Sequence, residues 1–366
     1  MNLMKLGMFL MPSHPPERSL YDATEWDLEM IQYADQLGYE EAWIGEHFTS
    51  PWEPIPAPDL LIAQALKSTK QIKLAPGAHL LPYHNPVELA HRVAYLDNLS
   101  QGRLMLGIGA GGLPSDYDTF GVDGLHGENR RMTAEALEIM LKIWKEKEPF
   151  EYKGEYWKAN RIEGNEFLRP HIEPYQKPHP QIGVTGLSPG SETLIMAGEK
   201  GFIPMSLGNN LDYIASHWKS VEEGAKRSGK TPQRSEWRIT RDVFVADTDE
   251  EALEGSLYSM MGRQHREYYL PLFKTLRAIS VFKHKESVDD NEVTPEYVAK
   301  HNWFVGSPET VATKFANIYE KVGGFGTLLV TGYDYSENPE AWKKSMRLLK
   351  EEVLPRLASK LSKVEI

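Results

Sequence analysis

The chain has 366 residues and 41% of them are hydrophobic, which is enough to bury the core of one large α/β barrel or of two smaller domains. Its 52 acidic and 41 basic residues give a net charge of −11, which argues against a nucleic-acid partner. The absence of cysteine excludes disulfides, cysteine metal ligands and a cysteine nucleophile.

Short apolar runs alternate with helical patterns about eight times along the chain. The first run is interpreted as a strand and not as a signal peptide, because no small-residue cleavage site follows it. No apolar run approaches the roughly 18 residues that a membrane span needs, so we expect a soluble, cytoplasmic protein without a membrane partner. The predicted strands cover 5–11, 41–46, 72–81, 104–108, 181–185, 202–206, 238–246 and 326–331.

The predicted helices lie between these strands and pack outside them. They cover 25–37, 59–68, 86–99, 131–145, 191–199, 211–227, 250–261, 308–322 and 339–349. Two segments break the rhythm, 150–177 after the fourth strand and 263–305 after the seventh. Since most strands are continuous apolar runs, both sheet faces should be covered. We predict an α/β fold, a single (β/α)₈ barrel domain over 1–366 with two insertions; an open doubly wound sheet is the alternative.

Glycines cluster where the fourth strand ends, at Gly107, Gly109, Gly111 and Gly112. Backbone without a Cβ can approach a flat ring or a phosphate closely, so this stretch predicts a cofactor-binding surface. The spacing also matches the dinucleotide fingerprint G-x-G-x-x-G, but the chain is expected to stay irregular to about residue 128, whereas a Rossmann site needs a helix opening inside the motif. A glycine-rich turn without a ligand is the simpler alternative.

A second candidate cofactor site follows the fifth strand, in V-T-G-L-S-P-G-S-E-T. Ser188 suits an N-cap and Pro189 the first helical position, and a helix N-terminus after a strand is a ready anion site. We therefore expect a phosphate here, balanced by Arg130 and Arg131; an ordinary capped helix with surface arginines is the alternative. The stretch also matches the hydrolase motif G-x-S-x-G, but Pro189 has no N–H for an oxyanion, which disfavours a hydrolase.

Glu46 and His47 end the second predicted strand together. A histidine with an ordinary pKa near 6.5 is the natural proton handler at neutral pH, so the pair is the candidate catalytic group. A structural carboxylate and a hydrogen-bonded histidine of the barrel rim are the alternatives. In the third strand, Gly77 and Ala78 indicate either a bulge beside a ligand or tight core packing. The 12 histidines show no metal-ligand spacing, so no metal site is expected.

Four motifs in order resemble the bacterial luciferase-like flavin-dependent monooxygenases, and the similarity extends over nearly the full length. They are Y-E-E-A-W-I-G-E-H-F, L-L-P-Y-H-N-P-V-E-L-A, L-S-Q-G-R-L-M-L-G-I-G-A-G and F-V-G-S-P-E-T-V-A. The resemblance implies a (β/α)₈ barrel that forms a homodimer and uses O₂ with reduced FMN supplied by a separate flavin reductase.

The resemblance also implies roles for individual residues. Glu46 and His47 would lie beside the flavin, with His47 as base or hydrogen-bond partner, and Gly77 and Ala78 against its ring. The FMN phosphate would be held by Arg131, Gly186, Ser188, Gly190 and Ser191. The chain departs from the light-emitting members at Gly109 and Ala110, where they carry a cysteine and an arginine, and at Gly186 and Leu187, where they carry polar groups.

From these observations we expect a monooxygenase that inserts one oxygen atom of O₂ into a small apolar organic substrate, with 263–305 as a lid that excludes water. Terpenes, cyclic ketones, long-chain aldehydes and alkanes all suit such a cavity, so epoxidation, hydroxylation and Baeyer–Villiger insertion are all compatible. The alternatives are an F420-dependent hydride-transferring oxidoreductase of the same fold and a non-catalytic flavin-binding protein.

Overall fold

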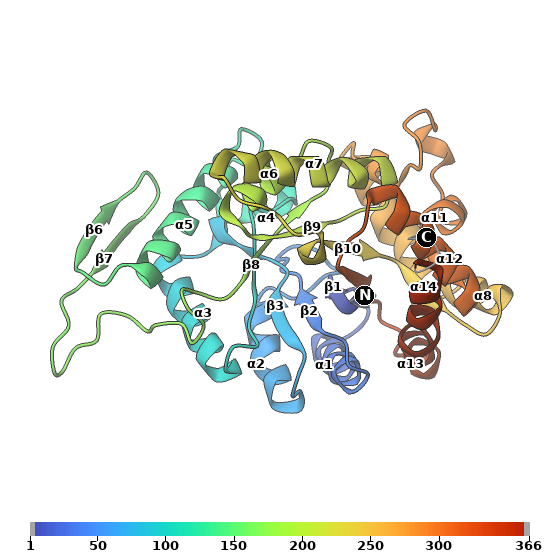
Figure 1. Cartoon of the computed structure of the whole chain (residues 1–366), viewed down its shortest axis with the longest axis horizontal. Helices are drawn as coiled ribbons and strands as arrows, with labels where there is room; N and C mark the ends of the chain where they lie inside the picture. Colours follow the sequence, from blue (N-terminus) through green and yellow to red (C-terminus); the bar gives the residue numbers. More distant parts are fainter. Residues whose placement is uncertain (1–3, 362–366) are drawn as a thin grey trace.

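A ring of parallel strands forms the centre of the computed structural model, which describes residues 4–361 (Figure 1). The hydrogen-bonded order is β3-β2-β1-β13-β10-β9-β8-β5-β4. A parallel bridge from Leu74 to Leu104 joins β3 to the residues just ahead of β5 and closes the ring. The strands are β1 Lys5–Leu10, β2 Glu41–Ile44, β3 Lys73–Pro76, β4 His79–Leu80, β5 Leu106–Gly109, β8 Ile182–Gly186, β9 Ile203–Ser206, β10 Arg238–Arg241 and β13 Thr327–Thr331. Because β3 and β4 are two halves of one interrupted strand, the predicted (β/α)₈ barrel is confirmed and the open sheet is excluded.

Helices cover the outside of the barrel, as the 3.6-residue periodicity predicted. In α12, for example, Val311, Phe315 and Ile318 face inward, and burying each such side chain contributes about 1.5–3 kcal/mol. The covering helices are α1 Leu20–Gln36, α2 Pro58–Ser68, α3 Pro86–Ser100, α5 Glu128–Lys145, α6 Glu192–Lys200, α7 Leu211–Ser228, α8 Asp249–Leu257, α12 Pro308–Val322 and α13 Pro339–Leu348. None of the helices within residues 4–361 is long and apolar enough to cross a membrane.

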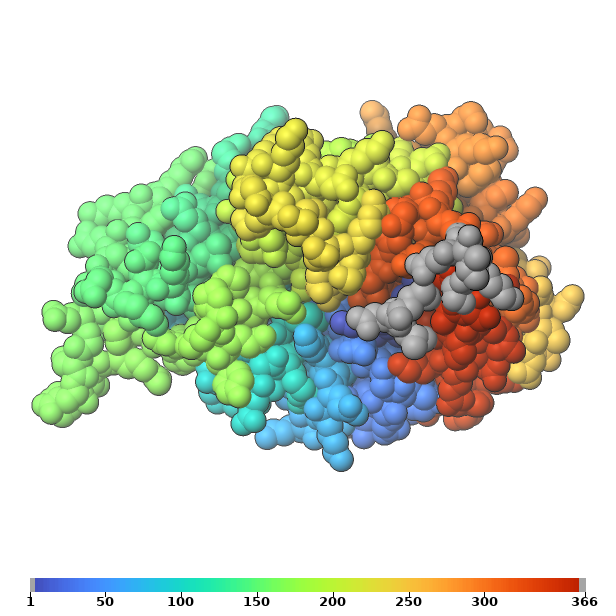
Figure 2. Space-filling model, viewed as in Figure 1, coloured from blue at the N-terminus to red at the C-terminus, as the bar shows by residue number. Residues whose placement is uncertain are grey.

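Two excursions leave the strand–helix alternation at the predicted segments. The first contains the antiparallel hairpin of β6 Phe150–Lys153 and β7 Lys158–Arg161, which projects from the barrel at the left of Figure 1 and contributes to a lobe in Figure 2. The second is mostly helical. Its elements are α9 Met260–Gln264, a π-helix His265–Tyr269, α10 Leu270–Thr275 and α11 Pro295–His301.

The predicted seventh strand, 238–246, is in fact two strands. β10 stays in the barrel, whereas β11 Val243–Val245 leaves it and pairs with β12 Phe304–Gly306. The break falls at Asp242, whose carboxylate accepts hydrogen bonds from Tyr333 and Asn209 at 2.6 and 3.2 Å.

Other boundaries also differ from the prediction. α1 begins at Leu20 and not at residue 25, because the Ser19 hydroxyl caps it by accepting the amide N–H of Asp22. The segment after the glycines, expected to be irregular, contains the short helix α4 Pro114–Phe120. Beyond Leu348 the chain continues through a π-helix, Leu349–Val353, into α14 Leu354–Leu361.

A buried ion pair links two strands inside the barrel. Glu41 begins β2 and Arg238 begins β10, and each carboxylate oxygen of Glu41 lies 3.1 Å from a guanidinium nitrogen of Arg238. Trp43 donates its indole N–H to the same carboxylate at 3.0 Å. Both charged side chains are buried, so each depends on the other for compensation of its charge.

Glu41→Ala should therefore lower the free energy of unfolding by about 3–5 kcal/mol in a urea titration, because Arg238 is left buried without its main counter-charge. Glu236 supplies a matched control, since its half-exposed carboxylate also pairs with Arg238, at 2.9 Å. Glu236→Ala should cost about 1 kcal/mol or less. Equal losses in the two variants would contradict a dominant role for the buried pair.

Candidate active site

The carboxyl ends of the barrel strands open into a cavity of about 650 Å³, a size typical of small-molecule sites. The barrel contributes Phe9, Met11 and the glycine-rich stretch after β5, and the loop after β9 contributes Leu207. Residues of the second insertion form a further wall, and this wall is largely aromatic. Its aromatic members are His265, Tyr268, Tyr269, Phe273 and Phe282.

The small residues predicted to form a cofactor surface differ in whether they line the cavity. Gly77, Ala78 and Gly109 line the cavity, and a Cβ built on neighbouring Gly112 would meet nothing within 4 Å. Gly107, in contrast, is not among the lining residues. A Cβ there would lie 2.3 Å from the carbonyl oxygen of Pro76, so close strand packing accounts for this glycine.

His47 lies between two buried carboxylates. Its Nδ1 is 3.4 Å from Oδ2 of Asp116, and its Nε2 is 3.5 Å from Oε2 of Glu53. Burial alone would lower the pKa of His47, but the charge of Glu53 and the hydrogen bond and charge of Asp116 outweigh it, and the pKa is raised. The imidazole therefore keeps its proton to a higher pH than a free histidine.

Neither of these carboxylates was predicted from the sequence. Glu53 lies in a proline-rich segment without periodicity, and Asp116 lies in α4, a helix that was not predicted. Asp116 is held in place by the amide and hydroxyl of Thr49, which donate to Oδ1 at 2.9 and 2.6 Å. The short helical pattern P-S-D-Y was the only local signal for it.

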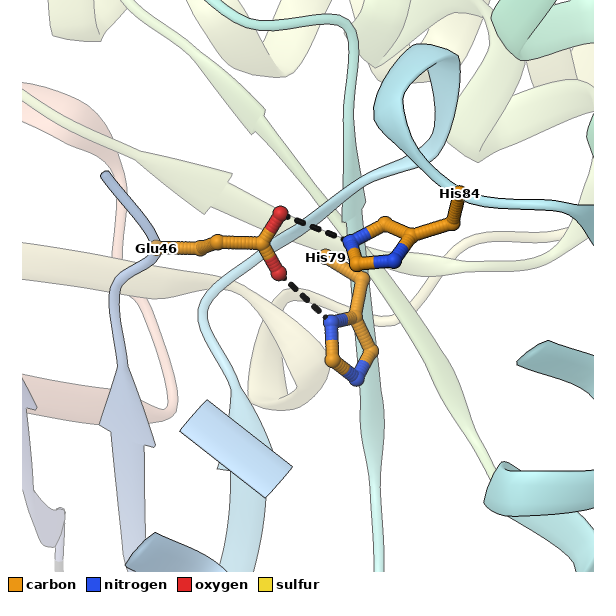
Figure 3. Close-up of side chains that lie close together, drawn as sticks. All are labelled: Glu46, His79 and His84. Atoms are coloured by element: carbon orange, nitrogen blue, oxygen red, sulfur yellow. Dashed lines mark hydrogen bonds and ion pairs between the residues drawn. The ribbon is translucent and has the colours of Figure 1, made fainter. Parts of the chain in front are cut away.

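Glu46 faces a different pair of histidines (Figure 3). Its two oxygens lie 2.7 Å from Nδ1 of His79 and 2.8 Å from Nε2 of His84, and the Leu80 amide donates to it at 3.2 Å. Burial raises the pKa of the Glu46 carboxyl, but the hydrogen bonds and charges of the two histidines outweigh this and lower the pKa to about 2. Glu46 is thus ionised at neutral pH and fastens the end of β2 to β4, which favours the interpretation of Glu46 as a structural carboxylate.

These three residues also place potential metal-ligand atoms within 4.8 Å of one another, although their sequence spacing gave no sign of it. The hydrogen bonds of Glu46 account for this cluster without a metal ion, because each carboxylate oxygen already has a histidine nitrogen as partner. Nη2 of Arg92 lies 3.5 Å from Nδ1 of His84, on the other side of that ring.

The loop predicted to bind a phosphate joins β8 to the N-terminus of α6. A Cβ on Gly190 would meet nothing within 4 Å, and no side chain of the described residues caps the helix, so its first amides are available. His217 contacts the carbonyl oxygen of Ser188 through Nε2 at 3.0 Å. Gly186 packs against Leu194, and the Ser191 hydroxyl lies 2.8 Å from that of Thr193.

The two arginines predicted to balance a phosphate point to different partners. Arg130 lies 3.9 Å from Glu192 in the first turn of α6. Arg131 donates to the Tyr156 hydroxyl at 3.1 Å and to the His126 carbonyl at 3.3 Å. The structure therefore brings Gly186, Ser188, Gly190 and Ser191 together and places Arg130, not Arg131, beside their helix.

The chain resembles known proteins over almost its whole length. A family model described as luciferase-like monooxygenase matches residues 4–324. The chain is 35% identical to 2,5-diketocamphane 1,2-monooxygenase 1 of Pseudomonas putida, over 97% of this chain and 99% of that protein.

Solved structures with the same fold include one with a bound flavin. The oxygenating constituent of 3,6-diketocamphane monooxygenase from Pseudomonas putida, a type II Baeyer–Villiger monooxygenase in complex with FMN, superposes with a TM-score of 0.91 at 36% identity, covering 96% of this chain and 98% of that chain. An F420-dependent secondary alcohol dehydrogenase superposes with a TM-score of 0.68 at 18% identity, over 97% of this chain and 99% of that chain, a likeness of fold alone.

Since both oxygens of Glu46 already have hydrogen-bonding partners, we expect dialysis against EDTA to leave the melting temperature of the protein unchanged. Metal analysis of the purified protein should find less than stoichiometric zinc or iron. A tightly held equivalent of metal, with destabilisation when it is removed, would show instead that Glu46, His79 and His84 are ligands.

Proposed function

This chain belongs to the luciferase-like monooxygenase family, and we propose that it is the oxygenating component of a two-component Baeyer–Villiger system acting on a cyclic ketone. It is a flavin-dependent oxidoreductase that uses reduced FMN and O₂ to insert one oxygen atom into an apolar organic substrate. The proposal of a cyclic ketone as substrate rests on one observation. The chain resembles an FMN-bound Baeyer–Villiger monooxygenase, at 36% identity and a TM-score of 0.91.

The residues at the cavity fit FMN. The small residues Gly77, Ala78 and Gly109 line the cavity and leave room for a flat ring, and the N-terminus of α6, which no side chain within residues 4–361 caps, offers amides to a phosphate. Reduced FMN supplies the electrons that activate O₂. Two alternatives have less support. An F420-dependent activity is supported only by likeness of fold. A non-catalytic flavin-binding protein would not need a histidine held between two buried acids.

The chain's own residues have three tasks in this reaction. Apolar side chains such as Leu207, Leu272 and Phe282 surround the hydrocarbon skeleton of the substrate. The insertion 263–305 acts as the lid that excludes water, because it forms one wall of the cavity. His47 holds a proton at Nε2 and releases or accepts it as charge develops on the reacting oxygen.

The reduced flavin comes from a separate flavin reductase, since the FMN-bound relative is described as an oxygenating constituent. We further propose that the chain forms a homodimer through α2 and α3, which expose Leu60, Tyr95 and Leu99 to solvent. We propose that the protein acts in the cytoplasm, where reduced nicotinamide cofactor is available to flavin reductases.

The purified chain, mixed with a flavin reductase, NADH, FMN and isotope-labelled O₂, should convert a bicyclic ketone into a lactone that carries one labelled oxygen atom. The corresponding hydrocarbon without the carbonyl should not be oxygenated. Mass spectrometry distinguishes the products. Oxidation of the hydrocarbon with no reaction of the ketone would refute the Baeyer–Villiger assignment, and hydrogen peroxide alone from every substrate would refute an oxygenase.

Replacement of His47 by asparagine removes the titratable proton while keeping a polar side chain. We expect the coupled rate of product formation to fall about 100-fold, with the consumed O₂ appearing as hydrogen peroxide. Binding of FMN, followed by quenching of its fluorescence, should change little. His126→Asn is the control, because His126 is a largely exposed histidine paired with Asp123; coupling equal to wild type in both variants would remove His47 from the reaction.

A further inference from the structure

One buried acid in the cavity has no part in the reaction as described above. Glu53 lines the cavity and is only 3% exposed. Its Oε2 lies 3.5 Å from Nε2 of His47 and 2.8 Å from the Tyr268 hydroxyl, and its Oε1 lies 3.3 Å from the Tyr269 hydroxyl. The carboxyl therefore stands between the histidine of the barrel and two phenols of the insertion.

The two tyrosines reach the same carboxyl although they are neighbours in the chain. Consecutive residues of an α-helix point about 100° apart, but Tyr268 and Tyr269 lie in the π-helix His265–Tyr269. Such a wide turn is rare and is frequently found at functional sites. The Tyr268 hydroxyl also lies 2.8 Å from that of Ser50, which can donate to it and leave the phenol hydrogen free for Glu53.

We propose that Glu53 is a positioning residue for His47: the charge of its carboxylate keeps the proton on the imidazole, and Tyr268 and Tyr269, which donate to that carboxylate, make this effect depend on the insertion that covers the cavity. The contact between His47 and Glu53 is an ion pair at 3.5 Å, and no bond forms or breaks in it. The functional part of the proposal rests on the proposed oxygenation. The positioning itself is a property of the protein alone.

The electrostatics show that the two groups are coupled. Burial raises the pKa of Glu53, and the charge of His47 and the two phenol hydrogen bonds only partly offset it, so that the pKa stays raised. The groups that face His47 are Glu53, Asp116 and, by charge alone, Glu46. The charge of Glu53 is the largest single contribution that raises the pKa of His47, so loss of that charge must lower the pKa of the histidine.

The direct test is an NMR titration of the full chain with isotope-labelled histidine, in which the His47 signals are assigned by their loss in His47→Asn. In Glu53→Gln the midpoint of His47 should fall by about one pH unit or more. Tyr268→Phe and Tyr269→Phe should each move it in the same direction but less, because Glu53 without a phenol donor keeps its own proton more readily. An unchanged midpoint in Glu53→Gln overturns the proposal.

Tyr335→Phe is the matched control, because Tyr335 is a buried tyrosine whose hydroxyl donates to the Gly255 carbonyl, away from Glu53. It should leave the His47 midpoint where it is in the wild type. If Glu53→Gln fails to fold, the His47 midpoints of Tyr268→Phe and Tyr269→Phe test the proposal instead. Unchanged midpoints in both tyrosine variants overturn it.

The functional readout is the share of consumed O₂ that appears as hydrogen peroxide, measured against pH with a bicyclic ketone. In Glu53→Gln the inflection due to His47 should shift to lower pH by the same amount as the NMR midpoint, and Tyr335→Phe should follow the wild type. A loss of coupling without a shifted inflection would indicate a merely structural role. If no ketone is oxygenated by the wild type, the proposed function fails while the NMR titration still decides the role of Glu53.

Discussion

Closure of the parallel barrel is the constraint on which the site depends. The bridge between Leu74 and Leu104 joins the third strand to the fourth, so that all eight strand positions end at one rim. Residues that follow β2, β3 and β5 then meet in one cavity, although dozens of residues separate them in the chain. The polar groups of the site are held by strand ends, which is why their positions are well defined.

The buried acids Glu46 and Glu53 lie in different environments, which shift their pKa values in opposite directions. Glu46 has histidine donors on both oxygens and its pKa is lowered, whereas Glu53 has weaker donors in a buried place and its pKa is raised. One carboxylate therefore stays charged and fastens β2 to β4, and the other forms an ion pair with His47. Titratable groups whose environments push their pKa values apart commonly take different roles at a site.

The glycines of the chain serve packing as much as binding. Gly107 makes room for the backbone of a neighbouring strand, while Gly109 and Gly112 border the cavity and open space. A glycine-rich strand end is thus an ambiguous sign of a cofactor, because both uses require a missing Cβ. The insertion adds what the barrel lacks, an aromatic wall and the two phenols that reach Glu53.

The sequence by itself determined the class of fold, because continuous apolar runs and helical periods record local burial. It also placed His47 at a strand end and, through its motifs, indicated the family and a flavin. Only the tertiary structure decided which acids face His47, since its contact with Asp116 spans 69 positions and Glu53 lies in a segment without periodicity. It likewise decided that Arg130 and not Arg131 lies beside α6, and that the seventh strand breaks at Asp242. Such pairings join residues that come close together only when the barrel closes, so local sequence patterns cannot predict them.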